Sequence, residues 1–183
     1  MLAVKCKLEK VDGIEKGGEL VVKGPNVMKG YILAENPGVL VPPVDGWYKT
    51  GDVVEIDEIG FVYIRDRIKR FAKIGGEMVS LTAVLDMVVK AYEWMGPDFG
   101  YGVVAIPHES KGEQIVLVTT NNQVKSDVLH EYIKNNGLSE LFMPRMILYR
   151  DSIPTLATGK TDNITLKKEV LAELDTQELQ KAS

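Results

Sequence analysis

The spacing of apolar residues changes once along this chain, near Ser80, and no other feature of the sequence restricts the possible fold as strongly. Before Ser80, short alternating runs such as "LAVKCKL" and "ELVVKG" are separated by glycine-containing turns, which is typical of antiparallel strands. After Ser80, helical runs alternate with short, continuous apolar runs that favour buried strands. The sequence therefore predicts an α+β chain in which a β-rich unit precedes a small unit of helices and strands.

Local signals assign several elements of these units. Ser80 is a suitable N-cap for a helix over "SLTAVLDMVVKAYEW". Six apolar residues of that segment share one face at helical spacing: Leu81, Val84, Leu85, Val88, Val89 and Tyr92. "YGVVAIP", "QIVLVTT" and "RMILYR" predict strands, "SDVLHEYIKNNG" predicts a short helix, and the residues from Asp162 onward predict an amphipathic helix that packs on its own sheet. In the β-rich unit, "GWYKTGDVVEIDEIGFVYIRDR" predicts two strands joined by a turn that contains Gly60.

Composition limits the class of protein. Because 45% of the 183 residues are hydrophobic, the chain can bury a core, either as one domain or as two small ones. The net charge of −4 gives no reason to expect nucleic acid as a partner. Cys6 is the only cysteine, so an internal disulfide is excluded, and we expect it to be a small buried residue. No apolar stretch approaches the ~20 residues that span a bilayer, and no signal peptide is recognisable, so we expect a soluble chain.

The segment "SIPTLATGKTDN" contains Gly159-Lys160-Thr161, and Gly-Lys-Thr is also how a phosphate-binding P-loop ends. That motif requires a glycine five residues before its Gly-Lys pair, and this chain has Pro154 there. Lys160 is therefore either an exposed lysine on a turn or a single positive charge that reaches a phosphate from a loop.

Other positions allow both a structural and a functional interpretation. Asp52, in "YKTGD", can shape a turn through backbone amides or accept hydrogen bonds from two neighbouring sugar hydroxyls. The basic run from Arg65 to Lys73 can be a solvated linker or a hinge, and it precedes Gly75-Gly76, where a ligand or another backbone can approach closely. The two histidines and the single cysteine have no spacing typical of a metal site or a catalytic triad, so no metal site is predicted.

Five segments in series resemble the acyl-adenylate-forming superfamily, which includes acyl- and aryl-CoA synthetases, luciferases and the adenylation domains of peptide synthetases. The segments are "GELVVKGPNVMKGY", "GWYKTGD", "GFVYIRDRIKRFAKIGGE", "AIPHESKGE" and "IPTLATGK", and they occur in the order of that superfamily over nearly the whole chain. The resemblance implies the carboxyl-terminal part of a larger ligase. Residues 1–66 are then a β-barrel subdomain at the end of the large adenylation domain, and residues 67–183 are a mobile α+β lid that includes the hinge.

"RFAKIGGEMVSL", "ENPGVL" and "MPRMILYRDSIPTLATGKTDNITLKK" are similar to one bacterial branch, the acyl-[acyl-carrier-protein] synthetases joined to a 2-acylglycerophosphoethanolamine acyltransferase. This similarity implies ATP-dependent activation of a fatty acid and transfer to the phosphopantetheine thiol of acyl carrier protein. It also implies lysophosphatidylethanolamine as acyl acceptor in the full protein, at the cytoplasmic face of the bacterial inner membrane. The alternatives are a fragment of an acyl-CoA synthetase and a non-catalytic lid-like module that docks a carrier protein.

The resemblance also assigns roles to particular residues. Asp52 matches the aspartate that binds the ribose hydroxyls of ATP, and Arg67 matches an arginine that contacts the nucleotide. Lys69 occupies the hinge position, and Gly75-Gly76 lies at the loop that lines the pantetheine tunnel. Lys160 matches the lysine that bridges the acyl carboxylate and the α-phosphate during adenylation.

Essential parts of such an enzyme are absent from this sequence. The chain has neither the Ser/Thr/Gly-rich phosphate loop of the superfamily nor the Thr-Glu motif that helps to hold magnesium. Because phosphates are bound by several amides or charges, Lys160 alone cannot hold ATP. We therefore expect ATP and Mg²⁺ to act in the full-length enzyme, no cofactor to bind this chain tightly, and the isolated chain to be inactive.

Overall fold

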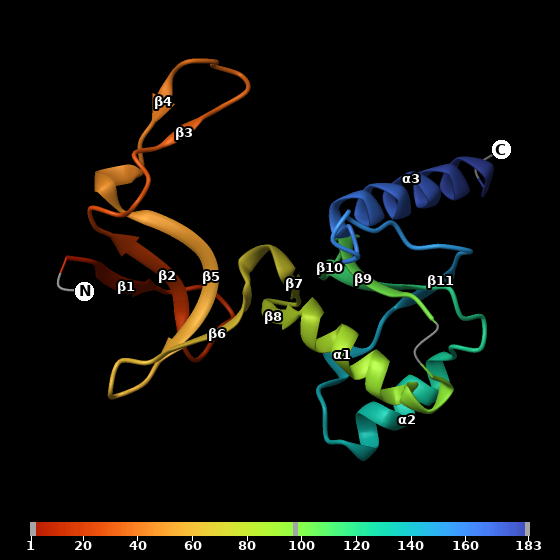
Figure 1. Cartoon of the computed structure of the whole chain (residues 1–183). Helices are drawn as coiled ribbons and strands as arrows, with labels where there is room; N and C mark the ends of the chain where they lie inside the picture. The colour runs from red at the N-terminus through yellow and green to blue at the C-terminus, as the bar shows by residue number, and fades with distance from the viewer. Residues whose placement is uncertain (1–2, 97–98, 182–183) are drawn as a thin grey trace. The chain divides into compact units, whose positions relative to one another are not determined.

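The computed structural model of the protein describes residues 3–96 and 99–181, except for the side chains of residues 177–181. The chain divides into two compact units, Met1–Arg70 and Phe71–Ser183 (Figure 1). The sequence predicts a boundary after residue 66, and the structure divides the chain after Arg70. The short helical turn Ile68–Arg70 therefore closes the first unit.

The first unit is built on one antiparallel sheet with the strand order β1-β2-β5-β6. Its strands are β1 (Lys5–Glu9), β2 (Gly18–Lys23), β5 (Tyr48–Ile56) and β6 (Val62–Arg67), and a separate small hairpin pairs β3 (Tyr31–Ile32) with β4 (Leu40–Val41). The barrel expected of this unit is in fact an open sheet, since β1 and β6 are its edges among the described strands. Four strands are too few to close, because small barrels need about five to eight.

The first unit confirms one local prediction, the β5–β6 turn, and contradicts another, the burial of Cys6. The β5–β6 turn is confirmed, since Asp57 Oδ1 accepts hydrogen bonds from the amides of Ile59 (3.1 Å) and Phe61 (2.8 Å) and Gly60 has a φ of 90°. The burial predicted for Cys6 is wrong, because this residue is exposed on the edge strand β1. An alternating run does not reveal by itself that a strand will form the edge of a sheet.

The second unit has a five-stranded mixed sheet centred on β10. Its strands are β7 (Phe71–Ile74), β8 (Glu77–Ser80), β9 (Tyr101–His108), β10 (Gly112–Thr119) and β11 (Met146–Tyr149). Its helices are α1 (Leu81–Ala91), α2 (Ser126–Asn135) and α3 (Asn163–Lys181). Strand β10 pairs antiparallel with β9 over its full length, parallel with β11, and with β7 only at Gly112 and Ile74. The predicted α+β class is confirmed.

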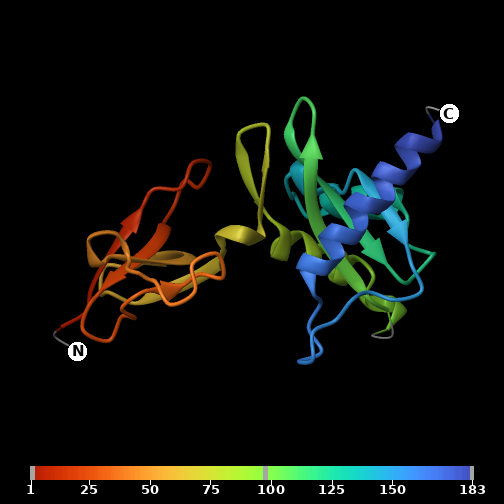
Figure 2. The same ribbon diagram turned by 90° about the horizontal axis from the view of Figure 1, so that it is seen from above.

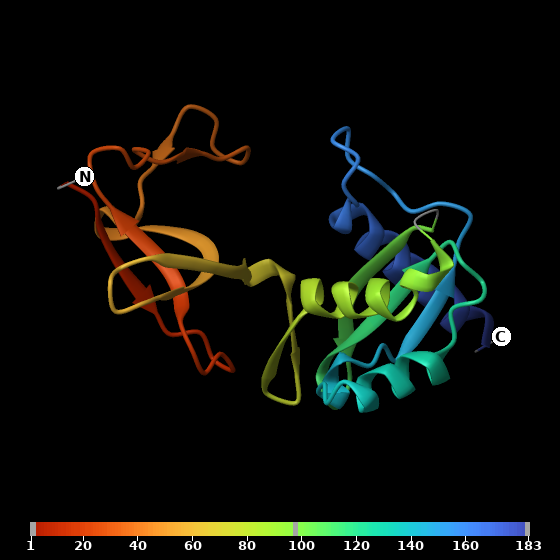
Figure 3. The same cartoon turned by 60° about the horizontal axis from the view of Figure 1, so that its bottom comes forward.

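Helices cover both faces of this sheet, with α1 and α2 on one face and α3 on the other (Figures 1 and 3). Alternate residues of the central strands divide between the two layers. Val103, Ala105, Ile115 and Leu117 pack with α1 and α2, while Val104, Ile106, Val116 and Val118 pack with α3. Strands buried on both faces read as continuous apolar runs, which explains the composition of β9 and β10.

Helix α1 begins where the sequence predicts, since Ser80 Oγ accepts a hydrogen bond from the amide of Ala83 at 3.1 Å. Its buried face, however, is rotated from the predicted one. Val89 is exposed, whereas Met87 and Ala91 are buried. Periodicity could not decide these three positions, because they flank the apolar stripe rather than lie at its centre.

The terminal helix packs on its own sheet, as predicted. Leu166 and Val170 of α3 are completely buried against the face that carries Val104 and Val116. Within the described residues, no helix has the length and apolar character required to cross a membrane.

Candidate functional site

Asp52 and Arg67 face each other across strands β5 and β6. Arg67 Nε lies 3.0 Å from Asp52 Oδ1, and the side chain of Asp52 is 20% exposed while that of Arg67 is 70% exposed. The pairing register of β5 and β6 determines this contact, because it shifts by one residue between Val53 and Val54. Without this bulge, Asp52 would lie opposite Asp66 instead of Arg67. The bulge therefore replaces a repulsive pair by an attractive one.

This pair keeps binding capacity for a ligand. A carboxylate accepts hydrogen bonds at both oxygens, and a guanidinium has five N–H donors, of which the one on Nε lies beside Asp52 as an ion pair. Among the described residues, no backbone amide donates a hydrogen bond to the Asp52 carboxylate. This carboxylate therefore pairs with Arg67 and does not stabilise a turn through backbone amides. An acceptor for hydroxyls thus lies beside a fork of donors suited to phosphate oxygens.

Lys69 lies in the helical turn Ile68–Arg70, at the end of the first unit. Its side chain is exposed and, among the residues that the structure describes, forms no ion pair. The turn follows directly on the strand that carries Arg67. The predicted hinge residue and the predicted nucleotide ligand are therefore two positions apart on one continuous backbone segment.

Gly75 and Gly76 form the two-residue turn that joins β7 and β8. Their φ angles are 61° and 95°, so both lie in the left-handed region that such a tight hairpin requires and that favours glycine. Apart from the glycine itself and its two neighbours in the chain, no described atom lies within 4 Å of the position that a Cβ would take at either glycine. The backbone of this turn is thus open to close approach by another molecule.

Lys160 lies on a small loop closed by a bridge between Thr155 and Thr161. Its carbonyl accepts a hydrogen bond from Leu156 N at 2.7 Å, and Gly159, with a φ of 79°, donates to the Leu156 carbonyl at 2.8 Å. The side chain is exposed, and no carboxylate of the described residues lies within ion-pair distance of its ammonium group. The backbone of Lys160 is therefore fixed while its charge is free to bind an anion.

Asp162 closes this loop and caps α3. Its amide donates to the Pro154 carbonyl at 2.8 Å, and its carboxylate accepts from the Thr165 hydroxyl at 2.7 Å and from the amides of Ile164 and Thr165. The Thr165 hydroxyl, together with these amides, lowers the pKa of Asp162. Because a carboxylate already occupies the amino end of α3, that helix end is not available for phosphate, in contrast to a P-loop.

The sequence-predicted residues fall into two groups. The first unit holds Asp52, Arg67 and Lys69, and the second holds the Gly75–Gly76 turn and Lys160. Within the first unit, the side chains of Asp52 and Arg67 are in direct contact. Among the described residues, no group of three or more histidine, cysteine, aspartate or glutamate side chains could hold a metal ion.

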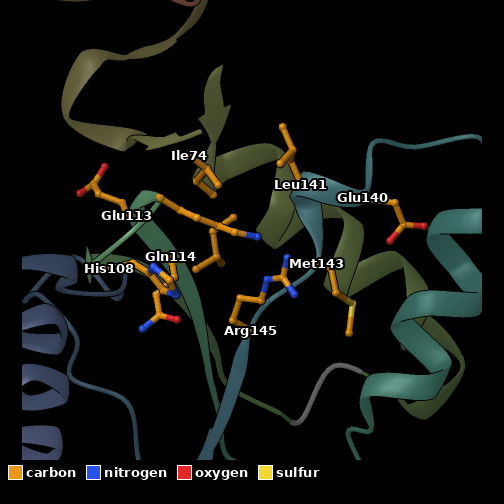
Figure 4. Close-up of a pocket in the computed structure, with 10 residues that line it drawn as sticks. Ile74, His108, Glu113, Gln114, Glu140, Leu141, Met143 and Arg145 are labelled. Atoms are coloured by element: carbon orange, nitrogen blue, oxygen red, sulfur yellow. The ribbon is translucent and has the colours of Figure 1, made fainter. Parts of the chain in front are cut away.

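The second unit also contains a small hollow of about 20 Å³ that the sequence does not predict (Figure 4). Its wall includes residues from β7, β9, β10 and the segment before β11: Ile74, His108, Gln114, Leu141 and Arg145. The guanidinium of Arg145 points toward the centre of this group of side chains (Figure 4). No local pattern could have indicated the hollow, because its residues are distant in sequence.

Comparisons with known proteins agree with this architecture, although no protein-family model matches the chain. The chain is 32% identical over 168 residues to the probable CoA ligase CCL9 of Humulus lupulus, which covers 90% of the chain and 31% of that protein. It is 30% identical over 158 residues to the long-chain-fatty-acid–CoA ligase FadD13 of Mycobacterium tuberculosis, which covers 85% of the chain and 30% of that protein.

Among solved structures, the o-succinylbenzoate CoA synthetase MenE of Bacillus subtilis, in complex with its acyl-adenylate intermediate, has a TM-score of 0.65 and 27% identity. That alignment covers 91% of this chain and 34% of MenE. The fold is that of the carboxyl-terminal part of acyl-adenylate-forming enzymes. The homologues of this chain are acyl- and aryl-CoA ligases of that superfamily, and the chain spans about a third of the length of the curated relatives it matches.

Proposed function

We propose that this chain is the carboxyl-terminal part of an ATP-dependent ligase that activates a fatty acid as acyl-adenylate and transfers it to the thiol of acyl carrier protein. In the full protein, this activity is coupled to acylation of 2-acylglycerophosphoethanolamine at the cytoplasmic face of the inner membrane. The observation that carries the proposal is the loop of Lys160, which fixes the backbone of this residue and leaves its ammonium group unpaired among the described residues. Such a charge suits a reaction between two anions, a carboxylate and a phosphate.

Asp52 and Arg67 fit the nucleotide of this reaction. The Asp52 carboxylate suits two ribose hydroxyls, and the donors of Arg67 that remain beside the 3.0 Å contact suit ribose or phosphate oxygens. When bound, ATP supplies the phosphorus atom that the fatty acid attacks. The amides at the amino end of α3 cannot bind its phosphates, because those of Ile164 and Thr165 already donate hydrogen bonds to the Asp162 carboxylate. We therefore assign the phosphate loop and the magnesium ligands to a part of the enzyme outside this chain.

The surface of the first unit supports a larger enzyme. The β5–β6 hairpin exposes several large apolar side chains in a row: Ile59, Phe61, Val62, Tyr63 and Ile64. Successive residues of a strand point to opposite faces, so apolar side chains are exposed on both faces of this hairpin. A large adenylation domain is the partner that the proposed function requires for this hairpin.

The proposal predicts different activities for the full-length ligase and for this chain alone. With ATP, Mg²⁺ and a fatty acid, the full-length protein is expected to form acyl-acyl carrier protein, and residues 1–183 alone are expected to form neither acyl-adenylate nor thioester. The measurement is product formation by mass spectrometry, with holo-acyl carrier protein and CoA offered separately. Turnover by the chain alone contradicts the fragment assignment. Acceptance of CoA but not of the carrier protein would identify an acyl-CoA synthetase instead, the acceptor used by the named relatives.

Acyl carrier proteins are acidic, and the basic run from Arg65 to Lys73, in which Arg70 is half-buried, is suited to meet them. Reversing two charges, Arg70→Glu with Lys73→Glu, is expected to weaken carrier-protein binding by about tenfold and to reduce its salt dependence. Isothermal titration at low and moderate salt measures both effects. Lys134→Glu, an exposed residue of α2, is the matched control. Unchanged affinity of the double variant would remove this run from the docking surface.

A further inference from the structure

Strand β7 lacks a full strand partner on the side of β10. The two strands pair only between Ile74 and Gly112, because β11 takes this edge of β10 from Val116 onward. The amide of Lys73 instead donates to a side chain, Glu113 Oε2, at 2.8 Å. A carboxylate of β10 thus replaces a missing ladder bond of β7.

The tip of the β7–β8 hairpin is held by the same part of the sheet. Gly75 N donates to the Lys111 carbonyl at 2.9 Å, so the Gly75–Gly76 turn is bonded to the turn between β9 and β10. Figure 2 shows these two hairpins side by side. The approach is close, because a Cβ on Gly112 would lie 3.0 Å from the Lys73 carbonyl oxygen. The hydrogen bond to Glu113 is therefore one of the few contacts that orient the Gly75–Gly76 turn.

Glu113 also reaches the helix that follows the Lys160 loop. Its second oxygen, Oε1, lies 3.8 Å from Lys167 Nζ on α3, a long contact between half-exposed groups that contributes little by itself. Glu113 also lines the hollow beside Arg145, but its carboxylate points away from the Arg145 guanidinium (Figure 4). One side chain thus connects the hairpin of Gly75 with the helix next to Lys160.

We propose that Glu113 is a positioning residue for the thiol-transfer step, because it holds the Gly75–Gly76 turn in the orientation that admits the pantetheine arm. This inference rests on the proposed function, in which that turn lines the path of the thiol. A turn of two glycines has little intrinsic rigidity, so its orientation depends on the bonds made by the strands that carry it. A hydrogen bond from an amide to a carboxylate is about twice as strong as one between neutral groups. Glu113 does not touch the reacting atoms in this scheme and acts only through the turn.

Two substitutions in the full-length ligase separate this role from a general effect on the fold. Glu113→Ala removes the acceptor for Lys73 N–H, and Glu113→Gln keeps a neutral oxygen in the same place. Since a bond to a charged group is involved, thioester formation from preformed acyl-adenylate is expected to fall about tenfold in kcat/KM for the thiol in Glu113→Ala. It is expected to stay within about threefold of wild type in Glu113→Gln, which retains the hydrogen bond without the charge.

Adenylation provides the internal control, because the proposed role concerns the second step only. Acyl-adenylate formation is expected to stay within about twofold in both Glu113 variants. Lys167→Ala, which removes only the 3.8 Å contact, is expected to leave both steps within about twofold. A wild-type rate of thioester formation in Glu113→Ala, or an equal loss in both steps, overturns the inference.

Amide hydrogen exchange of Lys73 in residues 1–183 tests the contact without any activity. Glu113→Ala is expected to accelerate this exchange at least about tenfold, and Glu113→Gln to restore much of the protection. Unchanged exchange in Glu113→Ala shows that the bond does not hold β7 and overturns the inference, while the proposed function stands. If the wild-type full-length protein forms acyl-adenylate but no thioester, the proposed function fails, and the inference fails with it.

Discussion

Replacement of Lys160 by alanine in the full-length ligase is expected to slow adenylation by about two to three decades. Attack of a carboxylate on the α-phosphorus brings two anions together, so a cation near both stabilises the transition state more than the ground state. A unit charge pair at ~4 Å and an effective dielectric constant of about 20 contributes roughly 4 kcal/mol, which corresponds to about three decades. Acyl-adenylate formation in a rapid-quench assay measures the effect directly.

The second step distinguishes this role of Lys160 from a structural one. Thioester formation from preformed acyl-adenylate is expected to stay within about twofold in Lys160→Ala, because the α-phosphate bond is already made. Lys168→Ala is the matched control, since Lys168 is another exposed lysine eight positions further along the chain. The proposal is wrong if Lys160→Ala forms acyl-adenylate at the wild-type rate or if the control loses as much.

A lysine on a loop suits a reaction that needs the charge in only one of two steps. The ammonium group is compact and flexible, whereas a guanidinium would present a flat fork. The backbone bonds of the Lys160 loop fix the base of the side chain and leave about four carbons of reach. In the proposed scheme this charge is exchanged for the Gly75–Gly76 turn between the two steps, and the proposed hinge residue Lys69 lies in the last turn of the first unit.

Local features of this fold could be predicted from the sequence because neighbouring residues determine them. The cap at Ser80 and the turn at Asp57–Gly60 depend on hydrogen bonds within a few residues of each other. The hairpin turn at Gly75 and Gly76 was not predicted, because the basic run before it indicates a linker or hinge, although the positive φ of both glycines is a local property.

Features that depend on distant residues could not be predicted. The contact between Asp52 and Arg67 requires the bulge at Val53, and a simple count from the turn would have placed Asp52 opposite Asp66. The hydrogen bond from the Lys73 amide to Glu113 joins residues 40 positions apart. It depends on the sheet arrangement, in which β11 pairs with β10 from Val116 onward and β7 pairs with β10 at Gly112. Sequence periodicity contains no information on such pairings.

The largest effect on stability is expected at the contact between α3 and the sheet. Leu166→Ala removes a side chain that is completely buried, and such substitutions cost about 2–5 kcal/mol because the cavity does not fully collapse. Packing at this position is tight, since a Cβ on Gly102 would lie only 2.4 Å from Leu166 Cδ2. Denaturant unfolding of residues 1–183, followed through the transition of the second unit, measures the loss of free energy.

Ile164→Ala is the matched control for this prediction, because Ile164 lies on the same helix and is 72% exposed. Its substitution is expected to change the free energy of unfolding by less than about 0.5 kcal/mol. Equal effects of the two substitutions would contradict the packing of α3 on β9 and β10. Since α3 begins immediately after the Lys160 loop, a large difference between them also shows that this loop is attached to a well-anchored element, as a reacting charge requires.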